Sequence, residues 1–280
     1  MINPSEEVFI REYAYVPEHM PGYVTAISGK EPFLLEGYLC YYGQDTLLFV
    51  GYPLKESFHE NKMDSVLETA VKRFKPAQVV LMAPTISRRL EQRGVPDTYY
   101  KLDLPSIPIR SKLKNMIHRA SRELQVEKTH EFKNEHLNLI ADFLRSRSVE
   151  EGTRSIFGKI PEYLSSVPTA WIFNARDRAG QMAAFDTAEF GAKNCAFYMF
   201  NFRSPKDCVP GASDLLLYTL IHDAQEQGKA YINLGLGINA GVAFFKKKWG
   251  GRPFLRHEFV SYRLERRSLL DALAKGLIRS

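Results

Sequence analysis

Two glycine-containing segments carry the residue types that bind anions. Residues 209–213 read VPGAS and precede an amphipathic helical pattern. The N–H groups and dipole of a helix N-terminus favour a negatively charged ligand, and Gly211 would let the backbone approach it closely. The same turn holds an acid, Asp214, which can simply cap the helix. This segment is therefore a candidate phosphate site, and the alternative is an ordinary helix start.

The second segment, residues 235–240, reads GLGINA and matches the G-x-G-x-x-G/A pattern of dinucleotide-binding loops. Two arguments speak against that interpretation. About 40 residues follow it, fewer than two further strand–helix crossovers of roughly 30 residues each would need. The acid expected about 20 positions later would be Glu258, which falls inside a predicted strand. We expect these glycines to form the turn after a strand.

Three consecutive lysines, Lys246–Lys248, follow two phenylalanines and precede Trp249-Gly250-Gly251. Lysines followed by glycine are typical of a helix C-terminus, where the helix dipole favours positive charge and glycine ends the helix. An ordinary helix end therefore explains the pattern by itself. A functional role is favoured by position, because this helix follows the strand next to the proposed anion turn.

Composition limits the class of protein. The chain has 280 residues, 45% hydrophobic and 25% charged, and a net charge of +6, which permits a phosphate-bearing partner without requiring one. No apolar run approaches the roughly 20 residues of a membrane span, and no signal-peptide pattern begins the chain, so we expect a cytoplasmic protein. Three scattered cysteines (Cys40, Cys195 and Cys208) do not make a disulfide framework. No metal site is expected, because the histidines show no ligand spacing, and no Ser-His-Asp order stands out.

Hydrophobic periodicity predicts an α/β protein. The predicted strands are 33–42, 45–54, 78–84, 98–104, 124–130, 169–177, 180–190, 194–203, 230–236 and 255–264. The predicted helices are 64–74, 86–93, 111–124, 134–147, 213–228 and 239–248, with a short helix and a loop over a cleft at 147–168. The segments RFKPAQVVLM and EQGKAYINLG occupy the same place in each half, which indicates a faint internal repeat.

Several pieces of the C-terminal half resemble a known superfamily. The pieces are Glu226-Gln227-Gly228-Lys229, Asn233-Leu234-Gly235, Phe245-Lys246-Lys247-Lys248-Trp249-Gly250 and the basic segment SKLKNMIHRASRELQVEK. They are similar to motifs of the GCN5-related N-acyltransferase (GNAT) superfamily, within it the FemABX-like aminoacyltransferases, and of the soluble catalytic part of phosphatidylglycerol lysyltransferases. The resemblance covers residues 110 to 263 of the sequence.

This resemblance implies tandem GNAT-like units, with mixed central sheets flanked by helices and an acyl-donor cleft at splayed strands. The expected units are 1–108, a degenerate N-terminal unit, and 109–280, a catalytic C-terminal unit. The implied activity is transfer of an acyl group from acyl-CoA to a small-molecule amine or amino-acid acceptor by direct attack.

The resemblance also implies a set of site residues. Lys246 would bind a phosphate or stabilise the oxyanion, and candidate general bases are Asp186, Glu189 and, with less support, His222. A solvated strand end is the alternative for the two acids. The donor would contact the following residues: Met199, Phe200, Asn201, Phe202, Val209, Gly211, Ala212, Ser213, Asn233, Asn239 and Lys246. Polar candidates for acceptor binding are Glu150, Glu151 and Arg154.

One departure from the family pattern leaves the donor open. Acyl-CoA-using relatives carry R/Q-x-x-G-x-G/A in the phosphate turn, and this chain has Lys206-Asp207-Cys208-Val209-Pro210-Gly211-Ala212. The alternative donor is an aminoacyl-tRNA, whose phosphates would contact a basic helix. Its cations are Arg110, Lys112, Lys114, Arg119 and Arg122. A third alternative is a catalytically inactive binding protein that keeps the fold.

Overall fold

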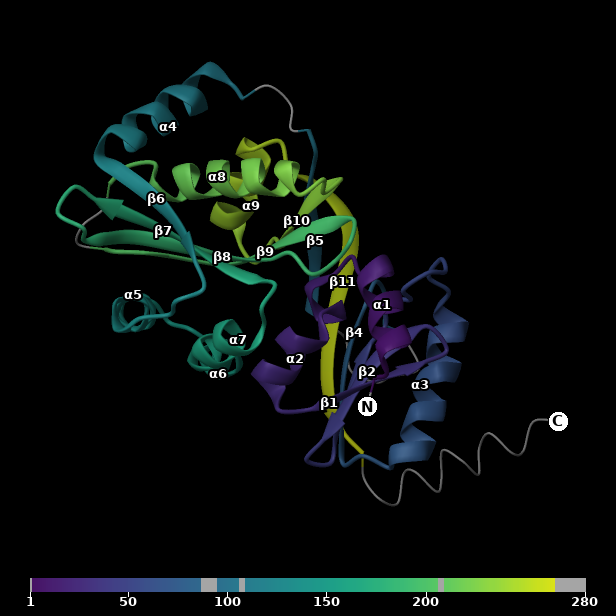
Figure 1. Ribbon diagram of the computed structural model, residues 1–280. Helices are drawn as coiled ribbons and strands as arrows, with labels where there is room; N and C mark the ends of the chain where they lie inside the picture. The colour runs from purple at the N-terminus through teal and green to yellow at the C-terminus, as the bar shows by residue number, and fades with distance from the viewer. Residues whose placement is uncertain (1, 87–94, 106–108, 206–208, 265–280) are drawn as a thin grey trace. The chain divides into compact units, whose positions relative to one another are not determined.

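The computed structural model (Figure 1) describes residues 2–86, 95–105, 109–205 and 209–264. Contacts divide the chain into two compact units. The first holds the residues up to Phe9, Gly29–Thr98 and the chain from Leu255 onward, and the second holds Ile10–Ser28 and Tyr99–Phe254. The predicted boundary at 108/109 borders a segment outside the described residues and stays a prediction.

The first unit is a sheet in the strand order β1-β2-β3-β4-β11. Its strands are β1 (Glu31–Leu35), β2 (Tyr38–Gly43), β3 (Thr46–Val50), β4 (Gln78–Ala83) and β11 (Arg252–Arg263). The helix α3 (Glu60–Phe74) buries an apolar stripe in the core of this sheet, as its helical period predicts. The predicted strand 33–42 is wrong in one respect: it is two strands, because Glu36 and Gly37 both have positive φ and form a tight turn.

The second unit is a mixed sheet in the order β5-β10-β9-β8-β7-β6. Its strands are β5 (Val95–Asp103), β6 (Leu124–Thr129), β7 (Ala170–Asp177), β8 (Met182–Glu189), β9 (Cys195–Arg203) and β10 (Tyr231–Leu236). Every described residue of β8 is buried, because helices cover both faces.

The two faces of this second sheet carry different helices, as Figure 1 shows. One face carries α4 (Ser111–Glu123), α8 (Ala212–Glu226) and α9 (Ala240–Lys248). The other face carries α5 (Asn134–Ser146), α6 (Glu151–Gly158), α7 (Ile160–Ser166) and α2 (Pro21–Ser28). We call these the α8 face and the α7 face.

The N-terminal segment was not predicted to form helices. It contains α1 (Pro4–Tyr13), the 3-10 helix η1 (Pro17–His19) and α2, which packs against α7. Proline opens each of these three short helices, where its missing N–H costs nothing. Their length is too small to show a clear apolar period.

The predicted internal repeat has a structural counterpart. In each unit a strand, a helix and a parallel strand follow one another, as β3-α3-β4 and as β9-α8-β10. RFKPAQVVLM and EQGKAYINLG form the helix end and second strand of these two crossovers. The other predicted elements lie within a few residues of their predicted positions. The predicted helix 86–93 lies almost entirely outside the described residues, and 147–168 contains two helices instead of one.

Candidate functional site

The parallel strands β9 and β10 separate in the middle of the second sheet. They pair at three positions only, Tyr231 with Cys195, Ile232 with Ala196 and Asn233 with Phe197. Beyond Phe197, β9 continues to pair with β8 up to Arg203, whereas β10 continues along β5. From Tyr198 onward, no described strand therefore pairs with the β9 edge that faces β10.

Local sequence explains where the strands separate. The Asn233 Oδ1 accepts a hydrogen bond from the Gly235 N–H at 2.8 Å, and a bulge follows in the β10–β5 ladder. Gly235 has φ +77°, a conformation that other residues rarely adopt. In β9 a second bulge leaves Met199 between the paired residues Tyr198 and Phe200. Both strands therefore lose their regular pairing at the same level of the sheet.

Lys246 reaches this level from α9. Its side chain is buried, and its Nζ donates a hydrogen bond to the Leu236 carbonyl at the end of β10. The Nζ also lies 5.9 Å from the centre of the Tyr100 ring. A Cβ added to Gly235 would have the Lys246 Nζ at 3.6 Å and the Tyr198 carbonyl at 3.7 Å as neighbours. The ammonium group thus lies beside both separating strands.

Asp186 lies on the α8 face of β8 and is fully buried. Its Oδ1 accepts a hydrogen bond from the Asn201 amide, which in turn contacts the Ser213 hydroxyl at 3.2 Å. Its Oδ2 has no hydrogen-bond partner among the described residues. Burial raises the pKa of Asp186 to about 8, and the Asn201 amide and the Tyr198 hydroxyl act in the opposite direction. The carboxyl group is therefore held in its protonated form at neutral pH.

Glu189 lies on the opposite face of the same strand, since it is an odd number of residues from Asp186. Its carboxylate accepts hydrogen bonds from the Tyr163 hydroxyl at 3.0 Å and from the Gly191 N–H at 2.9 Å. Burial raises its pKa, against the effect of these donors. Both acids are fully buried, so the alternative of a solvated strand end is wrong for each.

The start of α8 is tied to the end of α9. The Asp214 carboxylate accepts a hydrogen bond from the Trp249 indole N–H at 2.9 Å and pairs with Lys248 at 2.6 Å. The acid in the first helical turn therefore has two structural partners, Lys248 and Trp249, at the end of α9.

The predicted phosphate turn packs against α4. Gly211 has φ +88°, and a Cβ there would lie 2.9 Å from the Met116 Cγ and 3.2 Å from the Met116 carbonyl. Ala212 is buried, and Val209 packs against the same core. The close backbone approach that Gly211 permits is thus an approach to α4. Residues 206–208 of this turn lie outside the described residues.

On the α7 face, the side chains of Phe200 and Phe202 join an aromatic cluster. Phe157 of α6 lies edge-on to both rings, at 6.0 and 5.1 Å between centroids, and Phe143 of α5 lies edge-on to Phe202 at 5.5 Å. Met199 packs against the same cluster. Beside β9, this face therefore presents an apolar, aromatic surface.

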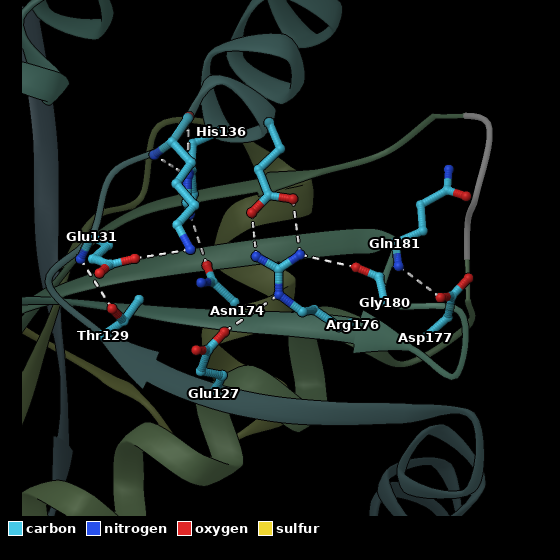
Figure 2. Close-up of polar contacts among 11 residues, drawn as sticks. Glu127, Thr129, Glu131, His136, Asn174, Arg176, Asp177, Gly180 and Gln181 are labelled. Atoms are coloured by element: carbon cyan, nitrogen blue, oxygen red, sulfur yellow. Dashed lines mark hydrogen bonds and ion pairs between the residues drawn. The ribbon is translucent and has the colours of Figure 1, made fainter.

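A polar network anchors α5 over this surface (Figure 2). The Arg176 guanidinium of β7 binds both carboxylate oxygens of Glu135 and donates to the Gly180 carbonyl at 3.0 Å. The buried His136 accepts the Lys133 N–H on Nδ1 and donates from Nε2 to the Asn174 side chain at 2.9 Å. Its pKa is lowered by burial, so the ring is neutral in this network.

The remaining predicted residues lie apart from the separating strands. Glu150, Glu151 and Arg154 are exposed at the start of α6, whose half-buried side chains near the aromatic cluster are Ile156 and Phe157. Asn239 caps α9 by accepting the Val242 N–H at 3.0 Å. His222 is exposed on α8. Among the described residues, no group of three or more His, Cys, Asp or Glu could hold a metal ion, and no helix could span a membrane.

Comparison with known protein families and with curated proteins finds no match. Solved structures do share this architecture. L-PGS from Bacillus licheniformis aligns with a TM-score of 0.59 and 17% identity, over 99% of this chain and 98% of that one. FemX aligns with a TM-score of 0.63 and 10% identity, over 100% and 99% of the two chains. A tandem GNAT protein from the clavulanic acid biosynthesis pathway aligns with a TM-score of 0.51 and 10% identity, over 81% and 78%.

The chain has a GNAT-like fold of the FemABX type. The predicted resemblance is thus confirmed for the fold. Within this GNAT-like fold, the structure brings together Lys246, the β9 edge that no described strand pairs with, and Asn233 at the point where the strands separate. Asp186, Asn201 and Ser213 form a second group on the α8 face. Glu189 does not join either group.

Sequence reasoning missed two kinds of residue in this GNAT-like fold. Tyr198 and Tyr100 lie beside Asp186 and Lys246, and their signal was only that of ordinary strand aromatics. The N-terminal segment also reaches the site, because the Asn233 amide donates to the Tyr15 carbonyl at 2.8 Å. No local pattern could have indicated a contact between residues 218 positions apart.

Proposed function

We propose that this protein transfers an acyl group from an activated carrier to an amine, in the cleft where β9 and β10 separate. The observation that carries the proposal is the early end of the β9–β10 ladder with the Lys246 ammonium beside it. An unpaired strand edge offers backbone N–H and C=O groups to an extended ligand, as in strand addition. The residues of this edge would be Met199 to Phe202.

Direct attack fits the groups at this place. The acceptor nitrogen attacks the donor's carbonyl carbon, and the new C–N bond forms. The bond to the donor's sulfur or ribose oxygen then breaks, and that atom takes up the proton that the nitrogen releases. The Lys246 ammonium would stabilise the oxyanion of the tetrahedral intermediate, a role that favours a fixed, buried cation.

The two acids among the predicted bases differ in how well they suit this reaction. Asp186 is close to Tyr198, at the level where the strands separate, and its raised pKa allows it to exchange a proton near neutral pH. Glu189 is held by Tyr163 and Gly191 on the other face, which suits a structural role. We therefore assign a proton relay to Asp186, acting through Tyr198: its carboxyl group gives its proton to the leaving atom and takes up the proton that the attacking nitrogen releases.

The first unit lacks an equivalent opening among its described residues. There β3 and β4 pair at five consecutive positions, from Thr46 with Gln78 to Val50 with Met82. The Gly51 N–H continues the contact by donating to the Met82 carbonyl at 2.7 Å. The strand pair at the corresponding place is closed, which supports a catalytic role for the second unit only.

Acyl-CoA is the first candidate donor. Its pyrophosphate would lie at the start of α8, near Ser213, and its pantetheine arm along β9. Aminoacyl-tRNA is the second candidate, and one observation favours it. The cations Arg110, Lys112, Lys114, Arg119 and Arg122 are all exposed at the start and along the outer side of α4, which packs against α8.

Titration with each donor tests the proposal. A donor that binds only the folded state raises the melting temperature, and the stabilisation grows with the logarithm of one plus the ratio of its concentration to Kd. Coenzyme A should do so if the first candidate is right, and a nonhydrolysable aminoacyl-tRNA analogue if the second is right. Transfer of a radiolabelled acyl group to a panel of primary amines then measures the activity itself. Absence of both binding and transfer would leave a protein that keeps the fold without the reaction.

Replacing Lys246 tests the mechanism. Lys246→Met keeps the apolar stem but removes the charge, so turnover should fall by about 100-fold or more while the melting temperature stays close to wild type. Lys247→Met is the matched control, because Lys247 is exposed on the same helix. Equal activity of the Lys246 variant and the control would remove Lys246 from the mechanism.

A further inference from the structure

The N-terminal segment brings a carboxylate to the separating strands. Residues 10–28 belong to the second unit, and Ala14 and Met20 pack against Cys195 and Phe197 of β9. Between them, the Tyr15 carbonyl accepts a hydrogen bond from the Asn233 amide, and Asn233 is the last residue of β10 that pairs with β9. Glu18 follows two residues beyond the buried Val16.

Glu18 is joined to the end of β10 through one tyrosine. The Tyr99 hydroxyl donates to the Glu18 Oε2 at 2.8 Å, and the Tyr99 backbone is paired with Leu236. Leu236 is the residue whose carbonyl accepts the Lys246 ammonium. Tyr99 and Tyr100 are neighbours in β5, so their side chains point to opposite faces of the sheet. The Tyr100 ring lies near Lys246, on the α8 face. The Tyr99 side chain and the Glu18 carboxylate that it binds therefore lie on the α7 face, beside the place where β9 and β10 separate.

The surroundings of Glu18 are apolar and aromatic. Its charge acts on the Tyr23 hydroxyl, and the Tyr23 ring lies 6.4 Å from Phe200 of the aromatic cluster. Burial is the main cause that raises the pKa of Glu18, although the Tyr99 hydroxyl opposes it. The side chain is only half-buried, whereas its neighbours Pro17 and His19 are buried. Glu18 is therefore a poorly solvated carboxylate in a residue that is still partly exposed to solvent.

We propose that Glu18 binds the amino group of the acceptor on the α7 face of the cleft, with the Tyr99 hydroxyl fixing the carboxylate in place. This inference rests on the proposed function. The acceptor would approach between Glu18 and the aromatic surface of Phe157 and Phe200, while the donor carbonyl faces Lys246 from the other side of the opening. A cationic amine carried on an apolar or aromatic body is the class of acceptor that this surface fits.

The binding also prepares the nitrogen for attack. An alkylammonium has no lone pair, so one N–H proton must leave before the C–N bond forms. In the proposed step that proton passes to a Glu18 oxygen, the ammonium becomes a neutral amine, and the carboxylate becomes a carboxylic acid. The proton then returns to solvent after transfer. No further reactant is needed.

Two probe amines test the inference. Butylamine is cationic at neutral pH, whereas hydroxylamine is neutral there and small enough for any acceptor site. Loss of one charged contact corresponds to about tenfold or more in affinity. In Glu18→Gln, the ratio of kcat/KM for butylamine to kcat/KM for hydroxylamine should therefore fall at least about tenfold, with KM for the donor little affected. Glu18→Asp should restore part of the ratio.

Control variants separate binding from folding. Glu12→Gln makes the same chemical change in the same segment, where Glu12 pairs with Lys193 at 2.7 Å, and should keep the wild-type ratio. Tyr99→Phe should lower the ratio less than Glu18→Gln does. An unchanged ratio in Glu18→Gln, at wild-type melting temperature, overturns the inference.

A binding measurement distinguishes this failure from failure of the proposed function. If the wild type transfers no acyl group to any amine, the proposed function fails. Butylammonium should even then raise the melting temperature of the wild type and not that of Glu18→Gln. Equal shifts in both proteins, or no shift in either, contradict the role of Glu18.

Discussion

Asp186 is a carboxyl group whose chemistry is set by where β8 places it. The strand is buried along its length, and hydrogen bonds from the protein only partly replace the lost water around this side chain. The protonated form is then favoured up to a pH of about 8. The energy of burying Asp186 thus depends on pH.

Replacing Asp186 should remove a pH dependence of stability. The folded pKa is about 8 and the ordinary value is 3.8, so the folded state binds the proton more tightly than the unfolded state. The free energy of unfolding should therefore decrease as the pH rises from about 4 to about 8, by up to about 1.4 kcal/mol per pH unit. Asp186→Asn, which keeps an acceptor for Asn201, should flatten this slope in urea denaturation at pH 5, 6.5 and 8. Parallel curves for the two proteins would contradict the raised pKa.

Asp186 and Glu189 illustrate what sequence can say about single residues. Both were candidate general bases under the family resemblance. Their separation of three already implies opposite faces, because side chains alternate along a strand. Asp186 accepts a hydrogen bond from Asn201 of β9, which also contacts Ser213 of α8, whereas Glu189 accepts one from Tyr163 of α7. These contacts follow from tertiary packing alone. Glu18 had no signal at all, since its partner Tyr99 lies 81 positions away.

At the scale of elements, Gly211 determines how closely α8 approaches α4. Gly211→Ala should destabilise the protein by about 1–3 kcal/mol, because the new Cβ would meet the Met116 backbone and because φ is +88°. Gly228→Ala at the other end of α8 is the matched control. It has φ +69° and open space around it, so only the conformational cost of about 1 kcal/mol applies. Equal denaturation midpoints for the two variants would show that α4 can shift to make room for the new Cβ without loss of stability.

The network of Figure 2 should fix α5 through the shape of one side chain. Lysine cannot reproduce the two parallel bonds from Arg176 to Glu135. Arg176→Lys should therefore lower the free energy of unfolding by about 1 kcal/mol. Arg145→Lys serves as control, because Arg145 lies on α5 and forms an ion pair with Asp142 in which the arginine is exposed. This replacement should change the free energy of unfolding by less than about 0.5 kcal/mol. Equal losses in both variants would mean that the fork geometry contributes nothing.

Helices and strands were predictable from the sequence where one face is buried, because burial makes apolar residues recur at regular spacing. Helices such as α3 and α4 repeat apolar residues at helical spacing, and α8 follows a glycine turn. The aromatic run 33–42 hid a turn because Glu36 is an unusual residue for positive φ. The separation of β9 and β10 was expected from the family resemblance alone. Its local causes, Asn233 and the bulge at Met199, were not visible in periodicity.

At the scale of the molecule, the two crossovers are alike in order and differ in strand pairing. The β3–β4 ladder is continuous and the β9–β10 ladder stops after three pairs. The same connection thus makes a continuous parallel ladder in one unit and a ladder that ends early in the other. The difference arises from a few residues at the end of one strand.

The distribution of charge at this scale predicts how the second candidate donor would bind. If the exposed cations of α4 contact phosphates, the affinity for aminoacyl-tRNA should fall steeply with salt. Lys112→Ala and Arg119→Ala should each weaken binding and reduce the logarithmic salt slope by about 1. Lys72→Ala on α3, whose lysine pairs with Glu68, should change neither quantity. Salt slopes that stay the same in all three variants would remove α4 from the donor site.

The hydrogen bond from Asn233 to Tyr15 has a consequence for how the protein is made. At roughly 5–20 residues per second, the 218 positions between these residues take roughly 10 to 40 seconds to translate. During that time the N-terminal segment has left the ribosome without the strand that will hold it. Its apolar residues Val16 and Met20, which are buried in the folded protein, are then exposed in the nascent chain and available to a chaperone. The contact between Asn233 and Tyr15 therefore forms late in synthesis, when both segments have left the ribosome.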